Sequence, residues 1–168
     1  MITVEEGIAL LEKQEEELQF AHFNRQDVWK LGKELAAKIL DDGLKLAVTI
    51  RLLNGFILFQ YAPEGTKTEN AYWLEKKFNV VRDLDASSLL HTLQLKKRNQ
   101  TLESRGLDPK AYAWGGGGFP IRVRGTGLVA VAAASGLPHL QDHDVLVESI
   151  AKILRIKDAP RLPLDAGL

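Results

Sequence analysis

The spacing of apolar residues changes abruptly near Leu46, and this change constrains the fold more than any other feature of the chain. Residues 1–43 carry apolar side chains at the three- and four-residue spacing of helices. Leu46–Leu53 and Phe56–Tyr61 are instead rich in β-branched and aromatic residues, and Asn54-Gly55 between them is a strong hairpin signal. Because a hairpin joins antiparallel strands, the sequence predicts helices packed on a mostly antiparallel sheet rather than a βαβ fold.

Capping signals divide the N-terminal part into two helices. Thr3 with Glu6 forms a capping box, and Asn24 with Asp27 resembles a second helix start. Gly43 stands where a glycine commonly ends a helix. Two separate helices are therefore expected before the hairpin.

The rest of the chain alternates helical spacing with short strand-like runs. The predicted helices cover Asn70–Val81, a segment from Ser87 or Ser88 to about Thr101, and a segment after Pro138; the predicted strands cover Phe119–Val123, Leu128–Ala134 and residues around Tyr112. The expected order is α-α-β-β-α-α-β-β-β-α, which is an α+β fold with five strands.

Composition limits the organisation and the partners of the chain. Its 168 residues suit one domain over residues 1–168, with residues 159–168 expected as a loose tail. Lys+Arg and Asp+Glu both number 22, so no net charge favours nucleic acid or an anionic membrane. Cysteine is absent, which excludes disulfides and thiolate nucleophiles. No apolar run approaches the roughly 20 residues that span a bilayer, so we expect a cytoplasmic protein.

The run Gly115–Gly118 invites comparison with a phosphate-binding loop. A dinucleotide-binding loop needs a helix start after it, whereas an apparent strand follows here, and no Gly-Lys-Ser/Thr completes a Walker sequence. A structural loop that lines a pocket is favoured, and a phosphate cradle remains the alternative.

The four histidines offer few metal sites. His139 and His143 stand four residues apart, but Pro138 and the nearby aspartates predict that the helix starts after His139. Since no third ligand has an obvious position, we predict no metal site there. His22 and His91 each allow two interpretations, a haem ligand or an ordinary hydrogen-bonded side chain.

Polar and aromatic residues recur on one face of a predicted helix. Asn70, Trp73 and Lys77 share that face, where they either contact a ligand or leave Trp73 in the core. Arg98 ends a short basic run that is either a solvated surface or a binding edge for carboxylates. Ser135 lies in Ala-Ser-Gly, which is not the elbow sequence of a serine hydrolase.

Several short sequences in the C-terminal half resemble those of one known family. They are Gly117-Gly118-Phe119-Pro120-Ile121, Gly127-Leu128-Val129-Ala130-Val131, Ala134-Ser135-Gly136-Leu137-Pro138 and Gln141-Asp142-His143. Together they are similar to the HbpS/GlcG-like haem-degrading family, and Asn70, Trp73, Lys77 and the pair Ser87-Ser88 are similar to its uncharacterised conserved-protein branch. The resemblance covers residues 5–155.

The resemblance implies a profilin-like fold with a five-stranded antiparallel sheet between helices, and homo-oligomers built from dimers. It also implies binding of haem or a related tetrapyrrole, with slow haem degradation in some members. The ligand-binding residues that we expect are Asn70, Trp73, Lys77, Ser88, Arg98, Gly117, Gly118, Pro120, Ser135, Asp142 and His143.

Two functions stay open at this point. The first is a protein that binds haem or a related planar anionic ligand, with at most weak haem-degrading activity. The second is a non-enzymatic homo-oligomeric adaptor, since the sequence contains no complete set of catalytic residues. Whether the protein is an enzyme, and whether it holds a cofactor, is left undecided.

Overall fold

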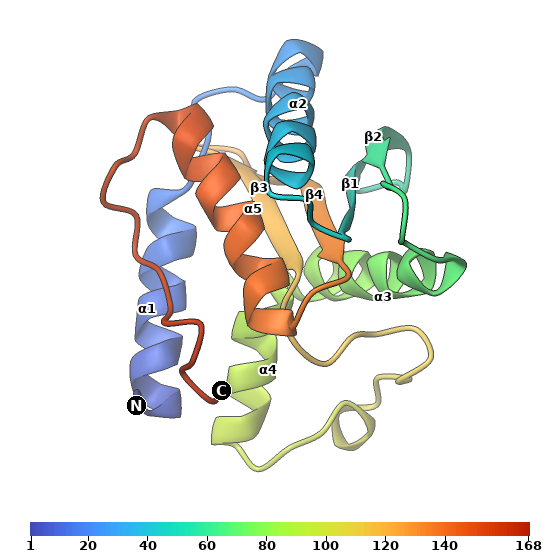
Figure 1. Ribbon diagram of the computed structural model, residues 1–168. Coiled ribbons are helices and arrows are strands. Elements are labelled where there is room, and N and C mark those ends of the chain that lie inside the picture. The colour runs from blue at the N-terminus through green and yellow to red at the C-terminus, as the bar shows by residue number, and fades with distance from the viewer.

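Four strands form one antiparallel sheet in the order β2-β1-β4-β3 in the computed structural model, which describes residues 1–168 (Figure 1). The elements in chain order are α1 (Val4–Glu17), α2 (Arg25–Asp41), β1 (Ala47–Leu52), β2 (Ile57–Tyr61), α3 (Thr68–Leu84), α4 (Ser88–Lys97), a short 3₁₀ turn η1 (Glu103–Arg105), β3 (Gly118–Val123), β4 (Gly127–Ser135) and α5 (His139–Leu154). The prediction of an antiparallel sheet flanked by helices is confirmed.

The local capping and turn signals are confirmed. Capping boxes begin both α1, at Thr3, and α2, at Asn24. Ser87 rather than Ser88 caps α4, and its side chain accepts a hydrogen bond from the Leu90 amide. β1 and β2 pair as a hairpin across Asn54-Gly55. These elements follow from short-range sequence, because each cap or turn satisfies backbone groups within a few residues.

The prediction of a fifth strand around Tyr112 is wrong. Asp108 organises this segment as a turn: its side chain accepts from the Lys110 amide and its carbonyl accepts from the amides of Ala111 and Tyr112. The Tyr112 hydroxyl donates to Asp83 on α3. The β propensity of one aromatic residue is therefore outweighed by aspartate turn chemistry, and the sheet has four strands.

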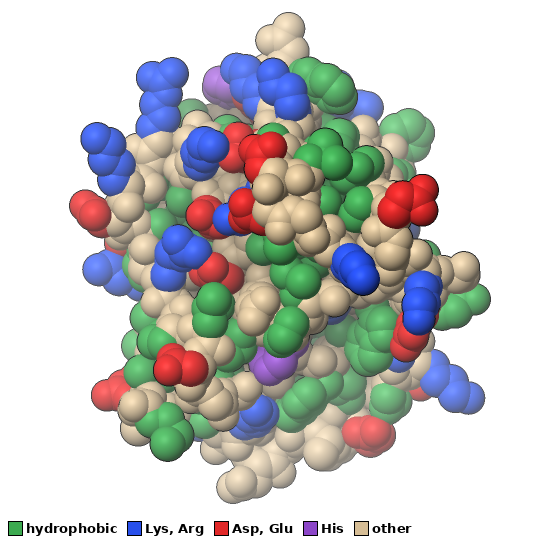
Figure 2. Space-filling model, viewed as in Figure 1, with side chains coloured by type: hydrophobic (Ala, Val, Ile, Leu, Met, Phe, Trp, Pro, Cys, Tyr) green, Lys and Arg blue, Asp and Glu red, His purple; other side chains and the backbone are tan.

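Helices cover both faces of the sheet. α2 and α5 lie on one face and α3 lies on the other, while α1 and α4 pack together beside the β3 edge (Figure 1). Figure 2, which has the same view as Figure 1, shows acidic and basic side chains interspersed over the face toward the viewer, in keeping with the zero net charge. No helix is long and apolar enough to cross a membrane.

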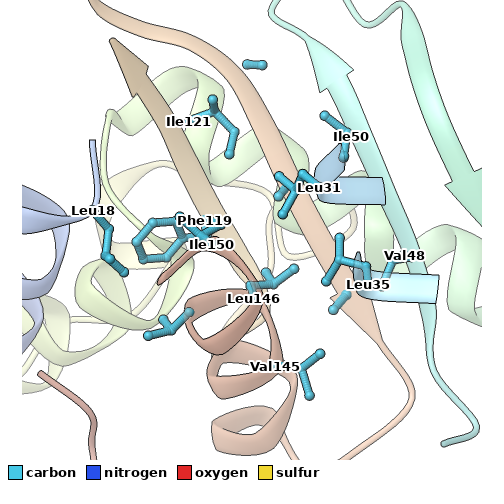
Figure 3. Packing of buried hydrophobic residues seen from close by; sticks show 14 of the residues in the cluster. Leu18, Leu31, Leu35, Val48, Ile50, Phe119, Ile121, Val145, Leu146 and Ile150 are labelled. Carbon is cyan, nitrogen blue, oxygen red and sulfur yellow. The ribbon is translucent and has the colours of Figure 1, made fainter. Parts of the chain in front are cut away.

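The main core fills the space between the sheet and the helices α2 and α5 (Figure 3). Strand alternation directs Val48 and Ile50 of β1 and Phe119 and Ile121 of β3 to this side. The residues that they meet are Leu31 and Leu35 of α2, and Val145, Leu146 and Ile150 of α5. The fully buried residues that β4 contributes here are alanines, and such small side chains let α5 lie close to the sheet.

The opposite face of the sheet fixes the position of α3. Phe78 and Val81 pack on Val131, and Leu74 packs on Ala47 and Ala133. This packing places the first turns of α3 beside the end of β4 and the start of α5. The candidate site lies at that junction.

The C-terminal residues, expected as a loose tail, run along α1 and α4. They form no helix or strand, but Leu162 and Ala166 are buried with Leu11, Leu89 and Leu93. The apolar side chains of the tail thereby complete a second, smaller core that the helices α1 and α4 leave incomplete on their own.

Candidate functional site

A cleft of about 330 Å³ opens between α3, the glycine loop and the start of α5. Its lining residues come from three segments: Glu69, Asn70, Trp73 and Lys77 on α3, Trp114 and Gly116 at the loop, and Ser135, Gly136, Leu137, His139 and Asp142 at the β4–α5 junction. Residues far apart in sequence therefore meet because β4 ends beside α3.

A buried ion pair forms the floor of the cleft. The Lys77 Nζ donates to Asp142 Oδ2 at 2.9 Å and to the Ala134 carbonyl at 2.7 Å. Asp142 Oδ1 accepts from the Leu137 amide at 2.8 Å. Burial lowers the pKa of Lys77 and raises the pKa of Asp142, and the attraction between the two groups opposes both changes.

Two glycines allow the backbone to approach this pair. Gly117 has a positive φ of 118°, and a Cβ there would lie 2.5 Å from both the Ala134 oxygen and the Lys77 Nζ. Gly136 has a φ of 152°, and its Cβ would lie 2.1 Å from the Lys45 carbonyl oxygen. Any other residue would displace the main chain at these positions.

The glycine loop is held by the protein itself. Its amides point at side chains of neighbouring helices: Gly115 donates to Thr92 Oγ1 at 2.8 Å, Gly116 to His139 Nδ1 at 3.3 Å and Gly118 to Ser88 Oγ at 2.9 Å. Because three of the four amides are used in this way, the loop does not present them to a phosphate group. The structural interpretation of the glycine run is the one that the geometry supports.

Asn70 joins the start of α3 to the end of β4. Its Oδ1 accepts from the Lys67 amide at 2.8 Å, and its Nδ2 donates to the carbonyl and hydroxyl oxygens of Ser135 at 3.3 and 3.2 Å. The side chain is thus committed to holding the wall of the cleft. The Ser135 hydroxyl hydrogen donates to no group within the chain and remains available to a ligand.

Two tryptophans stand at the cleft with much of their surface exposed. Trp73 is 37% exposed and Trp114 is 40% exposed, so Trp73 is not a core residue. The Lys76 Nζ lies 4.5 Å from the centre of the Trp73 ring. Sequence reasoning missed Trp114, although its position directly before the glycine run was a usable signal.

The prediction that His139 precedes the last helix is wrong, because α5 begins at His139, directly after Pro138. His139 lines the cleft and accepts from the Gly116 amide. His143, one turn later, does not line it: the ring is buried, and Nε2 contacts Gln14 Oε1 at 2.7 Å. No cluster of three or more His, Asp or Glu side chains suited to a metal ion occurs in the chain.

The predicted ligand-binding residues fall into two groups. Asn70, Trp73, Lys77, Ser135 and Asp142 line the cleft. The others are not among its lining residues. Gly117 and Gly118 belong to the glycine loop, and Ser88 accepts from the Gly118 amide. Pro120 lies opposite Val131 in the edge strand β3, His143 is a buried residue of α5, and Arg98 is exposed at the end of α4. Their role in binding stays a prediction.

The other two histidines lie away from the cleft. His22 is exposed between α1 and α2, with Nδ1 2.7 Å from Asp27. His91 is buried within α4, and burial lowers the pKa of its imidazole. Neither side chain is among the lining residues.

Comparison with known proteins gives consistent results. A family model described as "Haem degrading protein HbpS-like" matches residues 23–151. A UPF0303 protein of Yersinia enterocolitica is 42% identical over 138 residues, which is 82% of each chain. The crystal structure of the Ybr137w protein has a TM-score of 0.81 and 27% identity, and covers 90% of both chains.

A more distant solved structure is the PduOC:Heme complex. It has a TM-score of 0.65 and 16% identity, and the match covers 83% of this chain and 99% of that one. At this identity the likeness shows a shared fold alone. The haem of that complex is a ligand of that protein.

Proposed function

Because the chain belongs to the haem degrading HbpS-like family, we propose that its cleft binds a planar ligand carrying an anionic or other hydrogen-bond-accepting group. The observation that supports this is the meeting of two exposed tryptophans, Trp73 and Trp114, with the buried ammonium group of Lys77 in one cleft. Aromatic rings pack against flat ligands, and a few polar groups then fix the orientation.

The polar floor of the cleft has donors left over. Lys77 uses two of its three N–H groups on Ala134 and Asp142, and Ser135 keeps its hydroxyl hydrogen. A carboxylate or carbonyl oxygen of a ligand would accept hydrogen bonds from the remaining Lys77 N–H group and from the Ser135 hydroxyl group. The volume of about 330 Å³ lies at the small end of the roughly 300–1,000 Å³ range of ligand sites. A tetrapyrrole would therefore enter by one edge, with a propionate leading.

The residues of the cleft do not fit a haem whose iron is held by histidine. His139 is the one imidazole that lines the cleft, and its Nδ1 accepts the Gly116 N–H. A neutral ring that accepts through Nδ1 carries its proton on Nε2, so the remaining nitrogen has no lone pair for iron. The cleft supports binding of the flat macrocycle, and haem degradation is expected to be weak.

Tetrapyrrole binding is tested by quenching of tryptophan fluorescence with haemin and with iron-free protoporphyrin. A Trp29→Phe background removes the third tryptophan, which lies outside the cleft. We expect both macrocycles to quench to saturation at one per chain and with similar affinity, because no iron ligand is available. Replacing Ser135 with Ala should weaken the binding of both macrocycles by about fivefold, which corresponds to the free energy of one hydrogen bond.

Two results would contradict this proposal. One is the absence of saturable quenching by either macrocycle in the Trp29→Phe background. The other is unchanged binding when Trp73 and Trp114 are both replaced by Ala, measured by the change in absorbance of the macrocycle, with Tyr72→Ala on the same helix as the matched control. A strong preference for haemin over protoporphyrin would show instead that an iron ligand exists.

A homo-oligomeric adaptor is the second candidate, and the outer edge of the sheet favours it. Trp29, Phe56 and Ile57 form an edge patch beside β2, with 60%, 58% and 48% of their surfaces exposed. β2 is an edge strand whose outer backbone groups have no strand partner. An apolar edge strand is a template for pairing with another chain, such as a second copy within a dimer.

Light scattering at micromolar concentration tests the adaptor. We expect a mass above the 18.7 kDa of one chain, and a fall to that value for Ile57→Lys, because a charge on an edge strand prevents pairing. Tyr72→Lys, an exposed aromatic on α3, is the control that should keep the larger mass. A monomeric wild-type chain would contradict the candidate.

Two finer expectations belong to this proposal. Helices on both faces of an antiparallel sheet support the profilin-like architecture that the resemblance implies, with one strand fewer. The lack of cysteine is compatible with the reducing cytoplasm that we propose as the location.

A further inference from the structure

Lys77 differs from every other lysine of the chain in its surroundings. It is 5% exposed and is the one lysine among the buried residues, yet it lines the cleft. Lysine is almost never fully buried, since an ammonium group loses its hydration there. A buried ion pair is weak evidence for a gain in stability, so its presence at a ligand cleft calls for a chemical explanation.

The contacts of the Lys77 nitrogen leave one direction open. Three of its four tetrahedral positions are taken by Cε, by the Ala134 carbonyl and by Asp142 Oδ2. Once a proton has moved to Asp142 Oδ2, the lone pair of the amine faces that oxygen, and rotation about the Cε–Nζ bond turns it to the fourth position. A Cβ at residue 117 would lie 2.5 Å from Nζ, so a side chain there would displace the Lys77 nitrogen from its position beside Ala134 and Asp142.

Asp142 is placed to take the proton that the amine must lose. Its Oδ2 lies 2.9 Å from Nζ, within a hydrogen bond, and both groups are buried. Burial lowers the pKa of Lys77 and raises the pKa of Asp142, so both changes favour the neutral amine beside a protonated carboxyl group. Desolvation of a lysine is a known way to make its amine nucleophilic.

We propose that Lys77 forms a Schiff base with a small planar aldehyde or ketone held in the cleft, which rests on the proposed function of the cleft as a site for planar ligands. Asp142 accepts one proton from the ammonium group, and the free amine attacks the carbonyl carbon to give a carbinolamine. Asp142 then returns the proton to the departing oxygen. Two ammonium protons leave with that oxygen as water, and the third stays on the iminium nitrogen.

The charges in the cleft suit the product. The iminium carries the same single positive charge as the original ammonium group, so the ion pair with the Asp142 carboxylate is restored in the product. No oxidant, metal or further reactant is required. The aromatic side chains at the cleft, Trp73 and Trp114, would hold a carbonyl group that is conjugated with a flat ring.

Reductive trapping tests the Schiff base. The full chain is incubated with benzaldehyde and cyanoborohydride, which reduces an imine to a stable secondary amine, and peptide mass spectrometry locates the label. We expect Lys77 to be modified at least about tenfold faster than the neighbouring Lys76, because burial lowers the pKa of Lys77 and only the unprotonated amine is nucleophilic. The preference should vanish when the chain is unfolded in urea, where the cleft no longer exists.

Matched variants assign the effect to these residues. Lys76→Arg should leave trapping at Lys77 unchanged, whereas Asp142→Asn should slow it, because the proton acceptor is lost. If Asp142→Asn fails to fold, the native-to-urea comparison in the wild-type chain decides alone. Equal labelling of Lys77 and Lys76 in the folded chain would overturn the inference.

Fluorescence in the Trp29→Phe background separates this inference from the proposed function. Benzyl alcohol has the same ring without a carbonyl group and should slow the trapping by competing for the cleft. Saturable quenching by benzaldehyde without an adduct at Lys77 would overturn the Schiff base and leave the cleft as a binding site. The absence of both quenching and adduct would overturn both proposals.

Discussion

His143 is a buried imidazole that the structure keeps neutral. Gln14 donates through its Nε2 to the Pro160 carbonyl, so its Oε1 faces His143 Nε2 and accepts the proton that this nitrogen carries. The other ring nitrogen has no hydrogen-bond partner, and the ring packs edge-on to Phe119 with centroids 5.7 Å apart. Burial lowers the pKa of this imidazole to about 4.

This lowered pKa predicts a loss of stability in mild acid. Between about pH 4 and 6.5 the unfolded chain binds a proton at His143 that the folded chain does not, so the free energy of unfolding falls as pH decreases. From pH 7 to pH 5 the loss should be about 2 kcal/mol, at 1.4 kcal/mol per pKa unit. Urea denaturation at the two pH values measures it.

The matched variants for this prediction are His143→Phe and Leu164→Ala. His143→Phe should be less stable at pH 7, because Gln14 loses its partner. Its free energy of unfolding should nevertheless fall by about 2 kcal/mol less between pH 7 and pH 5 than that of the wild-type chain. Leu164 is exposed and does not titrate, so Leu164→Ala should keep the wild-type dependence on pH. An unchanged pH dependence in His143→Phe would show that the imidazole is not the titrating group.

At the scale of the elements, α2 and β2 touch through a glycine. A Cβ on Gly32 would lie 2.4 Å from the ring of Phe59, and the ring of Trp29 stands edge-on to the same phenylalanine. The helix therefore approaches the edge strand over the one position that has no side chain. Helix propensity alone would favour alanine over glycine at this position.

Gly32→Ala should consequently destabilise the protein. The gain of roughly 1 kcal/mol in helix propensity is outweighed by overpacking, which costs about 1–3 kcal/mol, so we expect a net loss near 1 kcal/mol in chemical denaturation. The double variant with Phe59→Leu should recover part of it, because the smaller side chain leaves room. A higher stability for Gly32→Ala alone would show that Phe59 moves aside freely.

At the scale of the whole molecule, the C-terminal residues close the second core. Leu162 is buried between α1 and α4, whereas Leu164, two residues later, is 51% exposed. Arg161 pairs with Asp144 on α5, and Pro160 accepts from Gln14 on α1. The tail thus ties the first and last helices together.

Replacing these two leucines by alanine tests the role of the tail. Leu162→Ala should cost about 2 kcal/mol, at the low end for a buried leucine, and Leu164→Ala should change stability by less than about 0.5 kcal/mol. Thermal or urea unfolding of the two variants gives the comparison. Equal and small changes in stability for the two variants would mean that the tail does not pack on α1 and α4 in solution.

The local elements were predictable because their signals are local. Caps at Thr3, Asn24 and Ser87 satisfy nearby amides, and the Asn-Gly turn sets the hairpin. The strand predicted around Tyr112 failed for the same reason, since the competing Asp108 turn is also local and was not recognised. A one-residue shift at the start of α5 moved His139 from a loop into the helix.

The sequence by itself determined the α+β class, the antiparallel hairpin, most helix boundaries and the segments that carry the site. Only the tertiary structure decided which of those residues meet, because the cleft joins α3, the glycine loop and α5, and Lys77 and Asp142 are 65 positions apart in the sequence. It also placed Trp114 and His139 at the cleft and Ser88, Pro120 and Arg98 away from it. Periodicity shows which face of a helix is buried, whereas packing alone determines what that face contacts.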